Sequence, residues 1–477
     1  MQDILLDYGD SKLNATLPDS ATVVRYKHTY DDPPATEPAE ATRQALIKPL
    51  GMPRLRDMAG PGKKIVIGFP DRVKGGTHAA SHRKVALPLV IEELLAGGAE
   101  LADITLVCAV GLHRMNTVEE WRQYLGKSVV DRFYPDRLVN HDAEASDILD
   151  FGIDEMGNVV QFNRLLGEAD IPIVIGHCSG NPYGGFSGGY KMIVTGLTTA
   201  ASIGSHHSPA TMHRDDWLGG STHSHMRRQF GSIGRAIERG IGKKIFAVDA
   251  VLGQKSQVLQ VSAGAIEEVE KATWPVAERR TNVVLDIKEP FDVLVMGLPR
   301  NFHYGPGMGT NPILMSLAIA GQLSRCWEVF REGGVVIAAS VCDGWFNESW
   351  FPSYRETYEA LQRYTTPADF LASAEAKRIA TDPEYCYRYS NTFTYHPFHA
   401  MSMLSGGEVT LQRTCAAIVA GARAPQYARG MGYRPVQTLD EAMRLAERYV
   451  GKNPRILCTP EAFSGGVTVH LKRKGSR

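Results

Sequence analysis

The feature that most constrains this chain is a repeated alternation of short apolar runs with longer amphipathic segments. In the first half, residues 63–70 form an apolar run of strand length, and residues 82–100 follow with apolar side chains at helical spacing. Further runs of strand length occupy residues 102–113 and 171–177. The second half repeats the pattern, with predicted strands at 291–299, 333–344 and 454–460 and predicted helices at 311–330 and 439–450. Such alternation is typical of parallel sheets covered by helices on both faces.

This pattern predicts two α/β domains with mainly parallel sheets. The chain has 477 residues, which is long enough for two domains with full cores. A hydrophilic stretch near residue 280 separates the two repeats of the pattern. We therefore predict an N-terminal catalytic and cofactor-binding domain over residues 1–280 and a C-terminal α/β domain over residues 281–477. A cleft between them is the default place for a cofactor and a substrate.

The composition excludes several classes of protein. Basic and acidic residues balance at 52 each, so the net charge gives no reason to expect nucleic acid or an anionic membrane as a partner. We find no run of eighteen apolar residues, and we expect neither a membrane span nor a signal peptide. The 7 cysteines are scattered and never form a CxxC motif. This usage is typical of reduced thiols in a cytoplasmic enzyme.

Polar and charged residues follow the predicted strands of the first half. Asp71 and Arg72 come directly after the first strand, His113 follows the second and His177 lies at the end of the third. Open α/β sheets bind ligands at the carboxyl ends of their strands. A lone histidine in a loop is most often a local hydrogen-bonding residue. Several such groups at neighbouring strand ends instead predict a functional site.

The segment from Asn181 to Pro209 concentrates glycine around one lysine and ends in a double histidine. The glycines between Gly184 and Gly189 indicate a backbone that must approach something closely. A phosphate-binding P-loop is excluded because Lys191 is preceded by tyrosine and followed by methionine. Residues 185–189 do match the G-x-S-x-G pattern of serine hydrolases, with Ser187 as nucleophile. That motif turns directly off a strand, whereas the predicted strand ends well before it.

One family is similar to the chain in all these features. The segments LDYGDSKLNATLP, VGLHRMNTVEE, VNHDAEASD and GFSGGYK, with the later SHH, resemble the nickel-pincer-nucleotide lactate racemases. The resemblance implies that Lys191 carries the cofactor covalently, a nickel pyridinium-3,5-bisthiocarboxylic acid mononucleotide. It also implies cofactor contacts from three further residues, a nickel ligand and two acid–base histidines. These positions are Asp71, Gly188 and Gly189 for the contacts, His207 for nickel with His206 as the neighbouring alternative, and His113 and His177 for acid–base catalysis.

The resemblance implies a racemase or epimerase of a 2-hydroxy acid. In such enzymes the hydrogen on the substrate carbon leaves as hydride to the cofactor ring, while a histidine removes the hydroxyl proton. The resulting 2-oxo acid is planar, so that hydride returns to either face. The expected partners are the small-molecule substrate and the enzymes that mature the cofactor. On this view, the glycines around Lys191 leave room for the tethered nucleotide.

Three departures from the family pattern concern the substrate. The Asp-x-Thr-Arg loop of the family is reduced to Asp71-Arg72 before an apparent insertion, so that Arg72, or alternatively Arg83, is expected to hold the substrate carboxylate. At the start of the helix after residue 310, Asn311 takes the place of a glutamine and Leu314 that of a lysine. Because that positive charge is missing, we predict a substrate other than lactate, with Asn311 as a contact.

Two insertions are expected to bring further polar residues towards the cleft. They are Lys74, His78, His82, Arg83, Asn181 and Tyr183. A serine hydrolase using Ser187 and a non-catalytic carrier of the nickel nucleotide stay open as alternatives. The oligomeric state is also left open.

Overall fold

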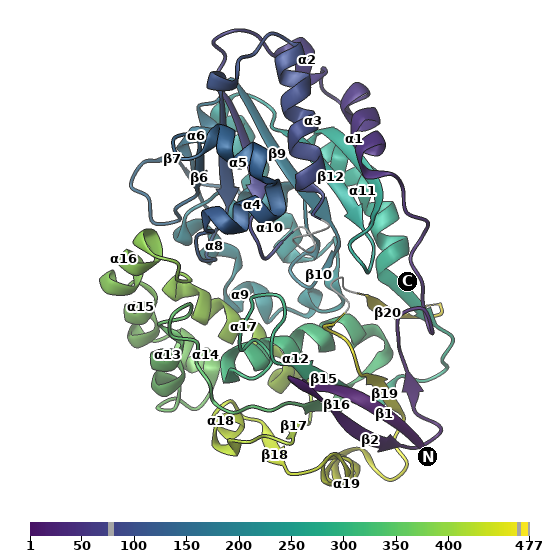
Figure 1. Ribbon diagram of the computed structural model, residues 1–477. Coiled ribbons are helices and arrows are strands. Elements are labelled where there is room, and N and C mark those ends of the chain that lie inside the picture. The colour runs from purple at the N-terminus through teal and green to yellow at the C-terminus, as the bar shows by residue number, and fades with distance from the viewer. Residues whose placement is uncertain (75–80, 465–468, 476–477) are drawn as a thin grey trace.

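The computed structural model describes residues 1–74, 81–464 and 469–475 and consists of two α/β units stacked end to end (Figure 1). The predicted fold class, α/β with mainly parallel sheets, is confirmed. In the described residues, no helix has both the length and the apolar character needed to cross a membrane.

The first unit is built on a six-stranded sheet in the order β13-β12-β9-β4-β5-β6. Its neighbouring strands are parallel except for the antiparallel pair β12–β13. Every residue of β4, β9 and β12 is buried, which explains why these strands are continuous apolar runs in the sequence. The strands are β4 (Ile65–Pro70), β5 (Ile104–Ala109), β6 (Leu138–Asn140), β9 (Ile171–Cys178), β12 (Phe246–Leu252) and β13 (Val258–Ala265).

Helices and two small hairpins surround this sheet. The helices are α1 (Pro38–Ile47), α2 (Leu55–Met58), α3 (Arg83–Ala96), α4 (Val118–Leu125), α5 (Lys127–Phe133), α6 (Arg164–Gly167), α7 (Tyr190–Gly196), α8 (Ala200–His206), α9 (Pro209–Met212), α10 (His225–Ile241) and α11 (Ile266–Thr281). The hairpins pair β7 (Ile148–Ile153) with β8 (Val159–Asn163) and β10 (Gly180–Asn181) with β11 (Gly185–Phe186).

The second unit contains an eight-stranded sheet whose strands come from both the N-terminal and the C-terminal parts of the chain. Its main path is β18-β17-β16-β15-β1-β2, with β19 beside β15 and β3 beside β19. The strands are β1 (Gln2–Gly9), β2 (Ser11–Leu17), β3 (Thr22–Val23), β15 (Phe291–Pro299), β16 (Phe330–Ala339), β17 (Ala416–Ala420), β18 (Arg434–Val436) and β19 (Ile456–Thr459). A separate parallel pair joins β14 (Asn282–Leu285) to β20 (His470–Arg473).

The N-terminal strands differ from the predicted division at residue 280, which placed residues 1–280 in one domain. β1 runs parallel to β15, and β3 pairs with β19, so the first strands of the chain belong to the second sheet. Ile4 and Leu6 pack in the same core as Val293 and Val295. The apolar pattern of a strand says which face is buried but not which sheet it joins, so that this pairing was not foreseeable.

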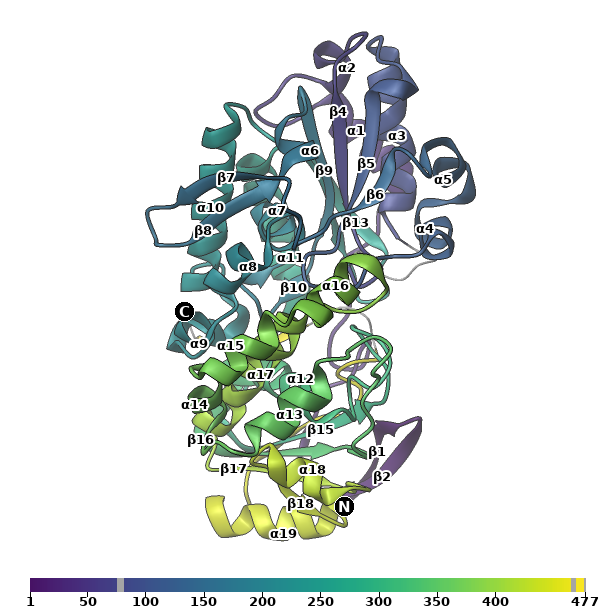
Figure 2. The same ribbon diagram turned by 90° about the vertical axis from the view of Figure 1, so that its left-hand side faces the viewer.

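A run of helices between β16 and β17 was also not predicted. The helices of the second unit are α12 (Pro312–Cys326), α13 (Tyr354–Leu361), α14 (Pro367–Leu371), α15 (Ala374–Ala380), α16 (Pro383–Asn391), α17 (Pro397–Arg413), α18 (Pro425–Gly430) and α19 (Leu439–Val450). Figure 2 shows α16 reaching from the second unit to the first. There the Tyr389 hydroxyl donates to the Gly111 carbonyl over 2.6 Å, and the His396 N–H donates to the Leu112 carbonyl over 3.0 Å. These contacts place the helical segment over the loop that carries His113.

Candidate functional site

Two adjoining cavities lie where the units meet, and we call them together the cleft. The larger one has a volume of about 440 Å³ and is lined by His177, Arg72 and residues of both units. The smaller one, of about 60 Å³, is lined by His113, Lys191 and His207. Both are also lined by Lys74, Asn181, Tyr183 and Tyr304. The cleft therefore collects most of the residues that the sequence had singled out.

The loop after β5 presents His113 to the smaller cavity, backed by an acid from the end of β4. The His113 Nδ1 lies 2.8 Å from Asp71 Oδ2. Burial opposes ionisation of Asp71, but His113, Lys74 and Arg83 outweigh it and hold the pKa of this carboxyl below its usual value. An ionised Asp71 accepts the Nδ1 proton and leaves the Nε2 lone pair of His113 free to take a proton.

His177 is the penultimate residue of β9, and its side chain lines the larger cavity. The charged groups that act on it are mainly cationic, although Asp71 also contributes. Burial lowers the pKa of His177 to about 3, and the nearby Arg83 and Lys74 add to the effect. The imidazole is therefore neutral at physiological pH.

Lys191 is the second residue of α7 and is buried. Its Nζ donates to the Tyr183 carbonyl over 3.1 Å and lies over the rings of Tyr183 and Phe230. Burial lowers the pKa of Lys191 well below its usual value, and Lys74 and Arg227 add to this. A shift in this direction favours the uncharged form of the amine, which is the form that acts as a nucleophile.

In the double histidine at the end of α8, one ring faces the cleft and the other is buried behind it. His207 lines the cleft and stacks on Tyr183, with ring centroids 5.2 Å apart. His206 is fully buried behind it, and the two Nδ1 atoms are 2.6 Å apart. Burial lowers the pKa of His207 well below its usual value, with His206 and Lys191 contributing, so that its ring is neutral and able to bind a metal.

The glycines before Lys191 make close contacts with the protein itself. Gly188 and Gly189 both have positive φ, and an added Cβ would lie 2.5 Å from Asp249 Oδ2 and 2.0 Å from Glu270 Oε1, respectively. These two buried carboxylates accept the N–H groups of Gly189 and Tyr190 at the start of α7, over 2.8 and 2.9 Å. The predicted explanation, room for a nucleotide, is thus not needed for these two residues. They allow the backbone to reach two acids that hold the loop.

The arginines expected to bind a carboxylate already have partners. Arg72 Nε lies 2.9 Å from Glu120 Oε1, and its guanidinium stacks on Trp350 at 5.0 Å. Arg83 is buried, stacks on Tyr124 at 3.9 Å and donates to the Lys74 carbonyl. Arg72 still lines the larger cavity, whereas Arg83 lines neither cavity among the described residues.

Lys74, in contrast, lines both cavities. Its Nζ lies 3.0 Å from His303 Nε2 and over the Tyr304 ring. Burial lowers the pKa of Lys74 to about 8, which Asp71 partly opposes. Lys74 is therefore the cation best placed to meet a carboxylate in the cleft, although the sequence had ranked Arg72 first.

Asn311 forms the N-cap of α12 instead of facing the cleft. Its Oδ1 accepts the N–H groups of Ile313 and Leu314 over 3.1 and 3.2 Å, and the side chain is buried. Leu314 is fully buried in the core. Among the described residues, neither one lines the cleft cavities.

Ser187 has no histidine within hydrogen-bonding distance among the described residues. Its hydroxyl donates to the His177 carbonyl over 3.0 Å and lies 3.1 Å from the Ser179 hydroxyl. A serine nucleophile requires an adjacent general base. The geometry does not favour a serine hydrolase.

The expected loop residues are divided between the cleft and the interior. Asn181 and Tyr183 line both cavities, as expected. His82 is buried, and its Nε2 lies 3.1 Å from the Thr42 hydroxyl, so that it does not serve the cleft. His78 lies outside the described residues.

Sequence reasoning missed the contribution of the helical segment to the site. His399 of α17 lines the smaller cavity, and its ring is 5.8 Å from that of His113 and 4.9 Å from that of Tyr304. Its Nδ1 lies 2.7 Å from the Tyr354 hydroxyl, whereas its Nε2 has no partner among the described residues. The only signal in the sequence was a histidine in an apolar helix, which is usually a core residue.

Comparison with known proteins identifies relatives along nearly the whole chain. Residues 8–218 match the family described as the lactate racemase N-terminal domain. The chain is 23% identical over 481 residues to a lactate racemase of Thermoanaerobacterium thermosaccharolyticum, covering 99% of this chain and 100% of that protein. It is 22% identical over 436 residues to a lactate racemase of Lactiplantibacillus plantarum, covering 90% of each.

Solved structures show the same fold. The lactate racemase apoprotein of Thermoanaerobacterium thermosaccharolyticum superposes with a TM-score of 0.71 at 20% identity, covering 99% of this chain and 100% of that one. A crystal structure of a protein from Thermotoga maritima gives a TM-score of 0.55 at 14% identity, over 91% of this chain and 97% of that one. The architecture of two stacked α/β units is thus shared.

Proposed function

We propose that this chain is a member of the lactate racemase family and a racemase or epimerase of a 2-hydroxy acid; its residues 8–218 match the lactate racemase N-terminal domain, and it is similar along nearly its whole length to lactate racemases. One observation carries the proposal. A histidine backed by a carboxylate, a buried lysine and a neutral histidine line the same small cavity, as His113, Lys191 and His207.

The residues present fit a lysine-tethered nickel-pincer nucleotide. Lys191 is buried and has no carboxylate partner among the described residues, so its amine is available for a covalent bond. His207 offers a neutral imidazole from the same wall. We assign Lys191 as the attachment point and His207 as the nickel ligand. When bound, the cofactor would supply a hydride acceptor beside the substrate carbon.

His206 supports His207 rather than replacing it. With the Nδ1 proton of His207 donated to His206, the Nε2 lone pair of His207 is left for the metal. We expect His207→Ala to abolish nickel retention and His206→Ala to weaken nickel affinity about 10- to 100-fold. Nickel content after dialysis, measured by atomic absorption, tests both. Greater loss in His206→Ala would move the ligand one residue upstream.

The acid–base work falls to the two histidines predicted for it. His113, ionically backed by Asp71, would take the hydroxyl proton of one enantiomer, and His177 would exchange a proton on the side of the larger cavity. Lys74 would hold the substrate carboxylate, because Arg72 is engaged with Glu120. Asp71 acts through His113, while Gly188 and Gly189 hold the loop that carries Lys191.

We further propose that the preferred substrate is larger or more polar than lactate. The cleft offers Asn181, Tyr183 and the unpartnered Nε2 of His399 beside the reacting groups. A polar atom buried without a partner costs free energy that a substrate hydroxyl or carboxylate would recover. The substrate is expected to carry such a group beyond the reacting carbon.

The proposal is tested with protein co-expressed with cofactor-maturation enzymes in the cytoplasm of the host. A panel of 2-hydroxy acids, including lactate, longer-chain, hydroxylated and dicarboxylic members, is followed by loss of optical rotation. The peptide containing Lys191 should gain the mass of the cofactor. Nickel-loaded protein that racemises no member of the panel would favour a non-catalytic carrier instead.

A further inference from the structure

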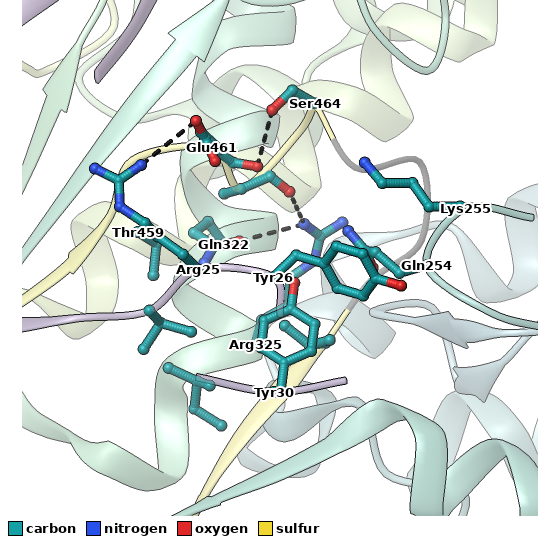
Figure 3. Close-up of a pocket in the computed structure, with 14 residues that line it drawn as sticks. Arg25, Tyr26, Tyr30, Gln254, Lys255, Gln322, Arg325, Thr459, Glu461 and Ser464 are labelled. Atoms are coloured by element: carbon teal, nitrogen blue, oxygen red, sulfur yellow. Dashed lines mark hydrogen bonds and ion pairs between the residues drawn. The ribbon is translucent and has the colours of Figure 1, made fainter. Parts of the chain in front are cut away.

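A third cavity, of about 70 Å³, adjoins the larger cavity of the cleft, with which it shares Arg325 and Ala462. Figure 3 shows the side chains that line it. Residues from five segments that are distant in the sequence line it, within 24–30, 254–255, 322–325, 459–464 and 469–471. Most of the labelled side chains in Figure 3 are polar or charged, and the Arg325 guanidinium lies among them. Nothing in the proposed racemase mechanism uses this cavity.

The charges around this cavity do not balance. Arg25 pairs with Glu461 at 3.4 Å. Behind the wall, Arg280 pairs with Asp32 at 3.3 Å and donates to Gln254 Oε1 over 2.7 Å. Within the described part of the chain, Arg325 and Lys255 have no carboxylate at ion-pair distance. Because Glu461 and Asp32 already pair with other arginines, the charges of Arg325 and Lys255 are not balanced by a carboxylate among the described residues.

Arg325 is held in place by neutral groups only. One of its Nη atoms donates to Gln322 Oε1 over 3.2 Å and to the Ala462 carbonyl over 3.3 Å, and its guanidinium lies over the Phe463 ring. Its Nε is buried without a hydrogen-bond partner among the described residues, and so is the hydroxyl of Thr459. Arg325 as a whole is partly buried, but a buried donor atom without a partner, beside a cation without a carboxylate, destabilises a protein unless a ligand satisfies it.

Arg325 has further cations near it, as the pKa values of this region indicate. Burial lowers the pKa of Arg325 to about 10, which leaves it protonated at neutral pH. His470 is buried, and its pKa lies well below the usual value because of burial, with Lys472, Arg325 and Arg280 adding to the effect. A guanidinium offers paired donors that match the oxygens of a phosphate group.

We propose that Arg325 binds a phosphate group, with Lys255 and the Thr459 hydroxyl as further contacts. Arg325 lines both this cavity and the larger cavity of the cleft. The phosphate is therefore either inorganic phosphate in the third cavity or the phosphate of a mononucleotide lying in the cleft. The second source rests on the proposed function; the first does not.

Binding of sodium phosphate and of nicotinate mononucleotide to the full-length protein without cofactor tests the proposal by calorimetry and thermal unfolding. The variants are Arg325→Gln, Lys255→Gln and the matched control Arg331→Gln, an arginine of β16 that pairs with Asp292 at 3.1 Å and does not line the cavity. Wild type and the control should bind at least one probe. Arg325→Gln should bind it at least tenfold more weakly, and Lys255→Gln should bind it several-fold more weakly.

The two probes separate the two sources. Phosphate that binds in an Arg325-dependent way identifies the third cavity as a free-phosphate site. Binding of the mononucleotide alone, again dependent on Arg325, identifies the cleft source. Equal binding by wild type and Arg325→Gln, or binding of neither probe, overturns the proposal. Should Arg325→Gln not fold, Lys255→Gln and Arg325→Lys decide, since both must weaken binding. No step requires racemase activity, so a failure here is distinguishable from a failure of the proposed function.

Discussion

His113 follows β5 and His177 lies near the end of β9, two parallel strands separated by β4. Both histidines line the cleft, yet the charges around them differ in sign. His113 has a buried carboxylate 2.8 Å from its Nδ1. For His177 the cations prevail: burial together with Arg83 and Lys74 lowers its pKa to about 3, which Asp71 only partly opposes. Two residues of one type near the ends of parallel strands thus lie in surroundings of opposite charge. The comparison teaches that their roles in a racemase need not be symmetrical.

The largest expected effect on kcat comes from removing the hydrogen bond between Asp71 and His113. Asp71→Asn should lower kcat by about 10²- to 10⁴-fold, because an amide cannot hold the His113 ring in the tautomer that frees Nε2. His113→Gln should do the same. Initial rates with each enantiomer measure this, at equal nickel content. Nearly unchanged activity in Asp71→Asn would show that the carboxylate is not needed for proton transfer.

A smaller effect on kcat is expected from substituting His177, which lies near Arg83 and Lys74. His177→Gln should lower kcat by about 10- to 100-fold, less than His113→Gln, because a poorly basic imidazole contributes less to general base catalysis. The two variants should also differ in which enantiomer still yields 2-oxo acid in a single turnover. A loss in His177→Gln equal to or greater than that in His113→Gln would contradict the asymmetry.

The cations around His177 give the next prediction. Lys74→Met should raise KM for the substrate by about 10- to 100-fold, since a charge-assisted contact to the carboxylate is lost. Arg72→Met serves as the matched control and should change KM less, because Arg72 already pairs with Glu120. If Arg72→Met had the larger effect on KM, the carboxylate would be assigned to Arg72, as the sequence first suggested.

The smallest effect is a pH dependence set by the same lysine. The pKa of Lys74 lies at about 8, so that its charge is present below pH 8 and lost as the pH rises through that value. kcat/KM should therefore be level from pH 6 to 7 and fall by up to about tenfold per pH unit above 8. Lys74→Arg should shift this limb to higher pH. A limb that stays in place would belong to another group.

The site could be predicted in part because chemistry and strand position coincide in this fold. The short apolar runs at 63–70, 102–113 and 171–177 were correctly expected as parallel strands, and the structure has them as β4, β5 and β9. Arg72, His113 and His177, which lie at the ends of these strands, do line the cleft. Arg72, Asn311 and the glycines near Lys191 were harder to interpret. Arg72 pairs with Glu120, and Asn311 caps the first turn of α12. The loop before Lys191 is held by Asp249 and Glu270. These partners are distant in the sequence or depend on exact backbone geometry, so that no local sequence pattern predicts the contacts.

The sequence by itself determined the α/β class, the alternation of parallel strands and helices that forms the core of each unit, and the candidate side chains His113, His177, Lys191 and His207, which line the cleft. Local periodicity and residue chemistry suffice for these. Only the tertiary structure decided that β1 to β3 join the second sheet, that α13 to α17 bring His399 to the cleft, and that His113 and His177 differ in charge environment. These depend on contacts between residues far apart in the chain, and the pKa of a buried group follows from the charges that folding places around it.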